Sequence, residues 1–176
     1  VLNAQADRRL KLGHLWIYSN EVDTARSPLK QFEMGQQALV TTNGGKPLGI
    51  ALMNPTSLIC GRIINRDESH PLNKSLLVHR FKQALALREL TFSEPYYRLV
   101  YGDSDLLPGL VVDRFGDYLV VQIAGAGMEL VKNDIIDALV QVLKPEGVLL
   151  SNDHSARALE NLPEYTQVVY GSVPEA

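Results

Sequence analysis

The segment that reads YRLVYGDSDLLPGLVVDRFGD, at residues 97–117, sets carboxylates and arginines around a tight corner. Apolar, β-branched runs stand on both sides of Leu107-Pro108-Gly109, which predicts a strand, a tight corner and a second strand. The charged members are Arg98, Asp103, Asp105, Asp113, Arg114 and Asp117. A turn alone does not require this much charge. The corner is therefore a candidate for a site, or for a contact with another domain.

The residues after the corner predict a hairpin, and those before it predict a helix. Leu110–Val112 and Tyr118–Val121 flank Arg114–Asp117, in which Gly116 is the expected left-handed residue. Upstream, apolar side chains recur at helical spacing from Leu76 to Leu90, and a proline soon afterwards ends that helix.

The last part of the chain continues this mixture of helices and strands. Its pattern predicts a helix along Leu130–Leu143, a short buried strand at Val148–Leu150 and a last strand at Thr166–Tyr170. Between the two strands, Asn152 or Asp153 is expected to cap a short helix. This half is therefore predicted to be an α+β domain with a mixed sheet.

Residues 1–66 are rich in short strands and turns. The expected strands are Trp16–Tyr18, Ala38–Thr42, Pro47–Met53 and Leu58–Ile64. Asn43-Gly44 joins the second to the third, and this dipeptide is typical of hairpin turns in which both residues have positive φ. Such a series predicts a small β-barrel or sandwich. A polar linker then follows at residues 65–73, which gives domains at 1–70 and 71–176.

Charge divides the chain in the same place. Residues 1–66 carry eight basic and four acidic side chains, a net +4, whereas residues 67–176 carry nine basic and sixteen acidic ones, a net −7. A basic surface attracts polyanions such as nucleic acid, while solvated charges without a partner are the alternative. No apolar run approaches the ~20 residues that span a bilayer, and no signal-peptide pattern is present. The single cysteine excludes an intramolecular disulfide and favours a cytoplasmic location.

The sequence contains no recognisable set of catalytic residues. P-loop, dinucleotide-binding, zinc-ligand and Gly-x-Ser-x-Gly patterns are absent. Cys60 lies in an apolar strand and is expected in the core. Asp103, Asp105 and Asp113 could hold Mg²⁺, but the simpler interpretation is a turn whose Asp and Ser side chains bond their own backbone, with arginines nearby.

Trp16 stands near His14 and Lys11, and a ring beside positive charge suits single-stranded nucleic acid. Taken by itself, Trp16 is instead expected in the core with Ile17.

Several stretches together resemble a bacterial family of S-adenosylmethionine-dependent methyltransferases that modify large-subunit rRNA; members with an assigned activity make 5-methylcytosine. These are Lys11–Val22, which resembles the opening of a PUA domain, Leu48–Ile59 with Arg62-Ile63, Arg80–Ala84 with Arg88, and Arg98–Asp117, which is the most specific. Near the end, Asp153, Arg157, Glu160 and Leu162 match a further family pattern. Leu15, Ser151 and Asn161 depart from the proline, arginine and glycine that the family usually has.

The resemblance implies a PUA-like β-barrel that captures RNA, followed by an α+β connecting domain. In the family, a Rossmann-like domain comes next, binds S-adenosylmethionine and supplies a cysteine that attacks C6 of cytosine. This chain stops about where that domain would begin, and Cys60 matches no family motif. The chain alone is therefore expected to be inactive, with no catalytic residue, bound cofactor or metal. The expected partners are rRNA and the missing catalytic domain, with no membrane, and a homodimer is left open.

Two groups of site residues follow from the resemblance. The RNA contacts, largely to phosphates, are expected at Arg8, Arg9, Lys11, His14, Lys46 and Arg62. The second group is expected to dock against the catalytic domain and shape the substrate cleft, with buried charges that lack partners in this chain; its members are Arg98, Asp103, Asp105, Asp113, Arg114, Asp153 and Arg157. The alternatives are an RNA-binding adaptor without enzymatic activity and a metal-dependent hydrolase.

Overall fold

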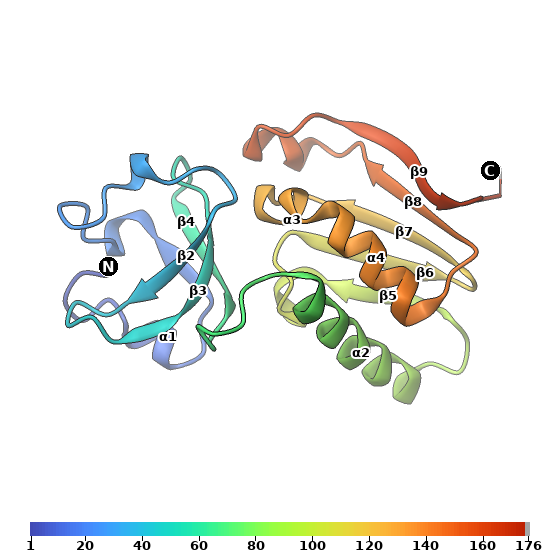
Figure 1. Cartoon of the computed structure of the whole chain (residues 1–176), viewed down its shortest axis with the longest axis horizontal. Coiled ribbons are helices and arrows are strands. Elements are labelled where there is room, and N and C mark those ends of the chain that lie inside the picture. Colours follow the sequence, from blue (N-terminus) through green and yellow to red (C-terminus); the bar gives the residue numbers. More distant parts are fainter. Residues whose placement is uncertain (175–176) are drawn as a thin grey trace. The chain divides into compact units, whose positions relative to one another are not determined.

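The computed structural model describes residues 1–174 and divides the chain into two compact units, Val1–Leu72 and a second from Asn73 onward (Figure 1). The sequence places this boundary at residue 70. No helix among residues 1–174 is long and apolar enough to cross a membrane.

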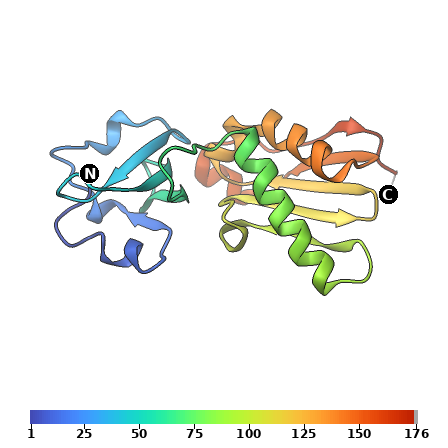
Figure 2. The same cartoon turned by 60° about the horizontal axis from the view of Figure 1, so that its bottom comes forward.

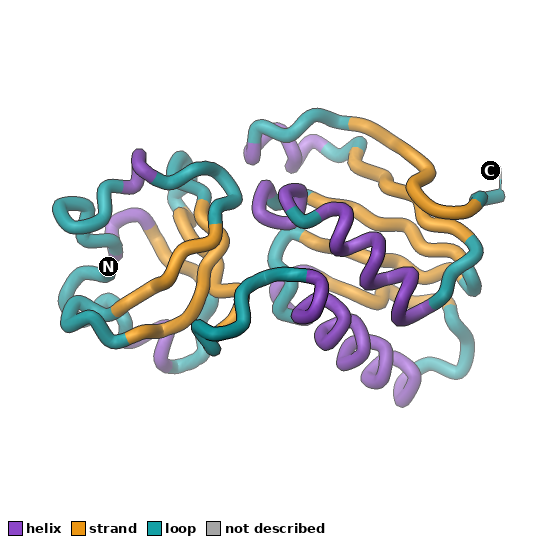
Figure 3. The backbone as a smooth tube through the Cα atoms, viewed as in Figure 1, coloured by secondary structure: helices purple, strands orange, loops and turns teal. Residues whose placement is uncertain are grey.

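The first unit is built on a four-stranded antiparallel sheet in the order β1-β4-β3-β2. Its elements are α1 (Arg8–Lys11), β1 (Trp16–Tyr18), β2 (Gln37–Thr41), β3 (Pro47–Met53), β4 (Ile59–Asn65) and the 3-10 turns η1 (Ser19–Glu21) and η2 (Leu29–Gln31), with loops between them (Figure 3). The Leu2 N–H donates to the Thr41 carbonyl at 3.0 Å, and the Asn3 N–H donates to the Glu21 carbonyl at 2.8 Å. The expected small barrel thus takes the form of an open sheet in which the N-terminal backbone joins the edge strand β2 to the turn η1 that follows β1.

Strand alternation decides which side chains of the first unit are buried. Ile17, Val40, Ala51 and Ile63 point into one core with Cys60, so the prediction for Cys60 is confirmed. The prediction that Trp16 is buried is wrong: its side chain is 40% exposed. Successive residues of a strand face opposite sides, so Ile17 in the core turns its neighbour outward.

The turn between β2 and β3 differs from the prediction. Asn43 and Gly44 do not have positive φ; Gly45 does, at 86°. The Gly45 N–H donates to the Thr42 carbonyl at 2.9 Å, and the register shifts at Thr41. A turn followed by a left-handed glycine makes the longer, bulged hairpin loop. The positive φ therefore falls on the third residue of Asn43-Gly44-Gly45 rather than on the first two.

The second unit is a five-stranded sheet in the order β5-β6-β7-β8-β9. Its elements are α2 (Lys74–Thr91), β5 (Tyr96–Tyr101), η3 (Gly102–Asp105), β6 (Leu110–Phe115), β7 (Tyr118–Ile123), α3 (Ala126–Leu130), α4 (Lys132–Leu143), β8 (Gly147–Asn152), η4 (Ser155–Glu160) and β9 (Tyr165–Gly171). β7 and β8 pair in parallel because α3 and α4 cross between them, and the other neighbouring strands pair antiparallel. The predicted α+β domain with a mixed sheet is confirmed.

The helices α2 and α4 lie side by side on one face of this sheet (Figure 2). The Asn73 side chain caps α2 by accepting the Leu76 N–H at 3.1 Å. The buried side chains of the two helices are Leu77, Arg80, Phe81, Ala84, Ile135, Ala138 and Leu139. Leu87 and Leu130, which the apolar pattern assigns to the same stripes, are exposed instead.

The turn between β6 and β7 agrees with its prediction, whereas the helix cap predicted at Asn152 or Asp153 is wrong. Gly116 has φ 62° in the β6–β7 hairpin, as predicted. Asn152 and Asp153 cap no helix: Asn152 ends β8 with its side chain buried, and His154 precedes the 3-10 turn η4. Asn161, where the family usually has glycine, ends η4 with φ 53°, a left-handed conformation that asparagine tolerates.

Candidate functional site

The charged corner of the second unit is a 3-10 turn followed by a sharp bend. After η3, Leu106 adopts a left-handed conformation with φ 58°, and Leu107 is fully buried. Gly109 has φ 79°, and a Cβ placed there would lie 2.8 Å from the Gly125 nitrogen. The Leu-Pro-Gly corner is therefore packed directly against the turn that follows β7, which explains why glycine is required.

Asp105 is held by an arginine from α2. The Arg88 guanidinium donates to both carboxylate oxygens at 2.6 and 2.7 Å, and the Tyr101 N–H donates to Asp105 Oδ2 at 2.7 Å. The side chains of Arg88 and Asp105 are only 14% and 8% exposed. The prediction that these buried charges lack partners is therefore wrong for Asp105. Its partner lies 17 residues away on another element, a distance at which sequence spacing gives no signal.

The other arginines of the corner have partners as well. Arg98 forms a two-pronged ion pair with Asp113 across β5 and β6, at 2.8 and 3.0 Å, and this hydrogen bonding raises the pKa of Arg98. Arg114 does not bind an Asp; it donates to the Gly116 carbonyl and to the Tyr97 hydroxyl. Asp105 and Asp113 thus point to different arginines, and no group of three potential metal ligands occurs within residues 1–174.

Arg157 of η4 is a buried hub rather than a surface residue. Its guanidinium donates to the Pro163 carbonyl at 2.7 Å, to the Ile123 carbonyl at 2.5 Å and to the Glu129 carboxylate at 3.1 Å. The side chain has no exposed area. Asp153, by contrast, is exposed and accepts a hydrogen bond from the Ser151 hydroxyl. The structure therefore separates two members of one sequence pattern into a structural residue and a surface residue.

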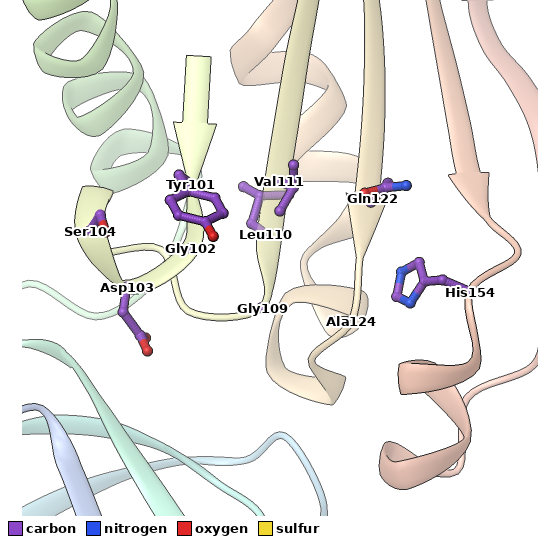
Figure 4. A pocket seen from close by; sticks show the side chains of 10 residues that line it. All are labelled: Tyr101, Gly102, Asp103, Ser104, Gly109, Leu110, Val111, Gln122, Ala124 and His154. Atoms are coloured by element: carbon purple, nitrogen blue, oxygen red, sulfur yellow. The ribbon is translucent and has the colours of Figure 1, made fainter. Parts of the chain in front are cut away.

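A cavity of about 380 Å³ opens at the end of the sheet beside the corner (Figure 4). Its lining comes from the ends of β5, β6, β7 and β8 and from the corner itself. The residues that line it are Tyr101, Gly102, Asp103, Ser104, Gly109, Leu110, Val111, Gln122, Ala124 and His154. Of these, only Asp103 is a site residue predicted from the sequence. Tyr101, Gln122 and His154 lie on three different strands or at their ends, so no local motif joins them.

In the first unit, two of the predicted RNA contacts are engaged in ion pairs. Arg9 donates to Glu21 at 2.7 and 3.2 Å and lies 4.9 Å from the centre of the Tyr18 ring. Lys11 pairs with Asp7, and the hydrogen bond from Lys11 lowers the pKa of Asp7.

The remaining predicted contacts are distributed over the first unit. Arg8 is exposed on α1, His14 follows that helix, and Lys46 is exposed in the β2–β3 loop. Arg62 of β4 is paired in register with Trp16 of β1, so an exposed ring and a basic side chain lie on neighbouring strands. Arg66, which the prediction omitted, donates to the His14 carbonyl at 3.0 Å.

Cys60 is expected to react slowly with thiol reagents in the native chain. Burial raises the pKa of its thiol to about 11, and its Sγ contacts the Ile17 carbonyl at 3.6 Å. Near pH 8 its thiolate fraction is therefore about a hundredfold below that of an unperturbed cysteine. Labelling with iodoacetamide, with and without urea, measures this. Equal rates in both conditions would contradict the buried position.

Comparisons with known proteins match the chain in two ways. Residues 1–66 match the family described as PUA-like domain. The chain is 32% identical to ribosomal RNA large subunit methyltransferase I of Aliivibrio fischeri strain MJ11, over 96% of this chain and 42% of that protein. The protein of the same name from Vibrio parahaemolyticus is 34% identical over the same shares. The chain is homologous to these relatives over most of its length and spans about two fifths of theirs.

Solved structures match the fold. A protein from Streptococcus mutans assigned as a SAM-dependent methyltransferase has a TM-score of 0.77 at 19% identity, with 99% of this chain and 43% of that one covered. A second protein, assigned as a methyltransferase and solved with SAH, has a TM-score of 0.75 at 19% identity, covering 96% of this chain and 41% of that one. At this identity the likeness establishes the fold.

Proposed function

Because residues 1–66 form a PUA-like domain and the chain is homologous over most of its length to ribosomal RNA large subunit methyltransferase I, we propose that it is the RNA-recognition and connecting portion of an rRNA methyltransferase. The observation that carries this proposal is the extent of the homology, which includes both units. The whole enzyme would use S-adenosylmethionine to methylate C5 of a cytosine in large-subunit rRNA, and this portion alone would be inactive.

The residues of the second unit do not fit S-adenosylmethionine. Nucleotide-like cofactors of α/β proteins bind at the turn between a parallel strand and the next helix. Between β7 and α3, the Ala126 N–H donates to the Glu160 carboxylate at 3.3 Å, and Gly125 packs closely against Gly109. The chain's own atoms fill the turn, so we place the cofactor in the part of the relatives that this chain does not match.

The proposed inactivity also rests on Cys60. A cysteine nucleophile works as a thiolate in an exposed, electropositive setting. Cys60 is buried between strands, and burial raises the pKa of its thiol to about 11, so it cannot supply the attack on the cytosine ring.

The proposed RNA surface of the first unit combines net positive charge with an exposed ring. Arg8, Lys46 and Arg62 form no ion pair within residues 1–174, which leaves these positive charges unneutralised for phosphates. Trp16, beside Arg62, adds a surface on which a base can stack. Arg9, Lys11 and His14 complete the proposed surface, although the charges of Arg9 and Lys11 are partly neutralised by carboxylates.

For the second unit we propose that the exposed members of the charged corner contact the catalytic part of the whole enzyme. These are Arg98 and Asp153, which are exposed, together with the partly exposed Asp103 and Asp113. Asp105, Arg114 and Arg157 would act indirectly, because their hydrogen bonds to backbone or side chains within the unit hold the corner and the end of the sheet in shape.

The chain is expected to bind large-subunit rRNA fragments with an affinity that falls steeply as salt rises, because phosphate contacts release condensed counterions. Replacing Lys46 or Arg62 by alanine should reduce the slope of log affinity against log salt by about 0.7–0.9 per lost phosphate contact. Filter binding across a salt series measures the slope.

The matched control is Lys82→Ala, which removes an exposed positive charge from α2 in the second unit. Its slope should equal that of the unaltered chain. An affinity that does not change with salt, or equal losses in all three variants, would contradict RNA capture by the first unit.

A further inference from the structure

The cavity at the end of the second sheet lies on the face that α2 and α4 leave uncovered. In β5, β6 and β7, Tyr101, Val111 and Gln122 are paired in register, so their side chains form one row across the sheet (Figure 4). The His154 ring, just past the end of β8, closes the far side of the row. With neighbouring strands about 4.8 Å apart, Tyr101 and Gln122 stand about 10 Å from each other.

The walls of this cavity differ in chemistry. Tyr101 is 57% exposed, and the Arg98 guanidinium lies 5.3 Å from the centre of its ring, which restrains the ring on one side. Val111 and Ala124 provide an apolar floor, and Gln122 and His154 offer hydrogen-bond donors and acceptors. Apolar surfaces with a few convergent polar groups characterise sites for small planar ligands.

Charge around the cavity disfavours an anion. Arg98 is neutralised by Asp113, while Asp103 lines the cavity and Asp153 adjoins His154. Phosphate would therefore be repelled, whereas an uncharged heteroaromatic ring would not. A ring stacked on Tyr101 would cover Val111 and bring its polar edge toward the Gln122 amide, which can pair with a base edge in two places.

We propose that this cavity binds a single unstacked nucleobase of the RNA substrate. The inference rests on the proposed function, in which the basic first unit holds the phosphates. In this proposal the first unit supplies the affinity for RNA through phosphate contacts, and the second unit contacts a base. This division agrees with the opposite net charges of the two parts of the chain.

Nucleosides test this directly, because they carry a base and no phosphate. Adenosine, cytidine, guanosine and uridine are titrated into the full 176-residue chain while the His154 ring and Gln122 amide resonances are followed by NMR. Saturable shifts at both residues are expected at millimolar concentrations. Tyr101→Ala should weaken binding by about tenfold or more, and Tyr101→Phe should retain it, because stacking needs the ring.

Tyr96→Ala is the matched control, since Tyr96 is an exposed tyrosine at the other end of β5, outside the cavity. Its nucleoside affinity should be unchanged. Absence of shifts at His154 and Gln122 with all four nucleosides, or equal affinities for Tyr101→Ala and Tyr96→Ala, would overturn the inference. Shifts produced only by a protein partner would overturn it as well.

Failure of the inference and failure of the proposed function are separable. Salt-sensitive rRNA binding without nucleoside binding removes the base site and leaves the proposed function intact. Nucleoside binding without rRNA binding keeps the cavity as a base site and contradicts the proposed capture of RNA by the first unit.

Discussion

Replacing Arg157 by leucine is expected to lower the free energy of unfolding of the second unit by about 3–5 kcal/mol, because a fully buried guanidinium that binds three acceptors at once is removed. The loss falls on several groups at once. The Glu129 carboxylate loses its buried partner and keeps only Lys132 at 3.5 Å and the Tyr165 hydroxyl at 3.0 Å, while the carbonyls of Ile123 and Pro163 lose their donors. Leucine fills part of the space but donates no hydrogen bond. Urea denaturation followed by circular dichroism measures the change.

Two further variants show that the loss arises from burial and hydrogen bonding. Arg98→Leu breaks an arginine–carboxylate pair that is two-pronged but more exposed, in the same sheet, and it should cost only about 0–1 kcal/mol. Arg157→Lys should recover a small part of the loss, because one ammonium group cannot span three acceptors. If Arg157→Leu and Arg98→Leu lowered the free energy of unfolding by equally small amounts, the buried contacts of Arg157 would not stabilise the second unit as proposed.

The regular elements of this fold were predictable because short-range patterns determine them. The bounds of β3 match the prediction, β2 and β4 match to within one residue, and the helix before the corner also lies where the spacing puts it. Local steric rules placed Gly116 correctly. They misplaced the positive φ at Asn43-Gly44, because the adjacent Gly45 allowed a longer loop that competes with the two-residue turn.

The site was less predictable because its parts meet through tertiary contacts. Asp105 meets Arg88 and Arg157 meets Glu129 across separations of 17 and 28 residues, so the expectation of unpaired charge, which followed from docking to another domain, overlooked partners that the fold supplies. The cavity was equally hard to predict, because tertiary contacts bring its residues together. Tyr101, Gln122 and His154 become neighbours only when β5, β6, β7 and β8 line up, and no one of them stands out in the sequence.

Replacing Asp105 by alanine is expected to cost about 3 kcal/mol and to abolish nucleoside binding. The carboxylate neutralises Arg88 and accepts the Tyr101 N–H, so its removal leaves a largely buried guanidinium unpaired and releases the end of β5. Because Tyr101 forms the cavity wall, stability and base binding should fall together. Urea denaturation and the nucleoside titration, carried out well below the melting temperature, measure the two effects.

The double variant Arg88→Leu/Asp105→Leu distinguishes the two roles of Asp105, which neutralises Arg88 and accepts the Tyr101 N–H. Removing both charges should restore much of the lost stability, since a buried ion pair and a well-packed apolar pair are often similar in free energy. Nucleoside binding should stay weak, because the Tyr101 N–H still lacks the acceptor that fixes the strand end. Recovery of both properties would show that Asp105 only balances Arg88. Recovery of neither would mean that the corner requires the carboxylate itself to fold, and in that case the charge concentrated there serves structure before it serves binding.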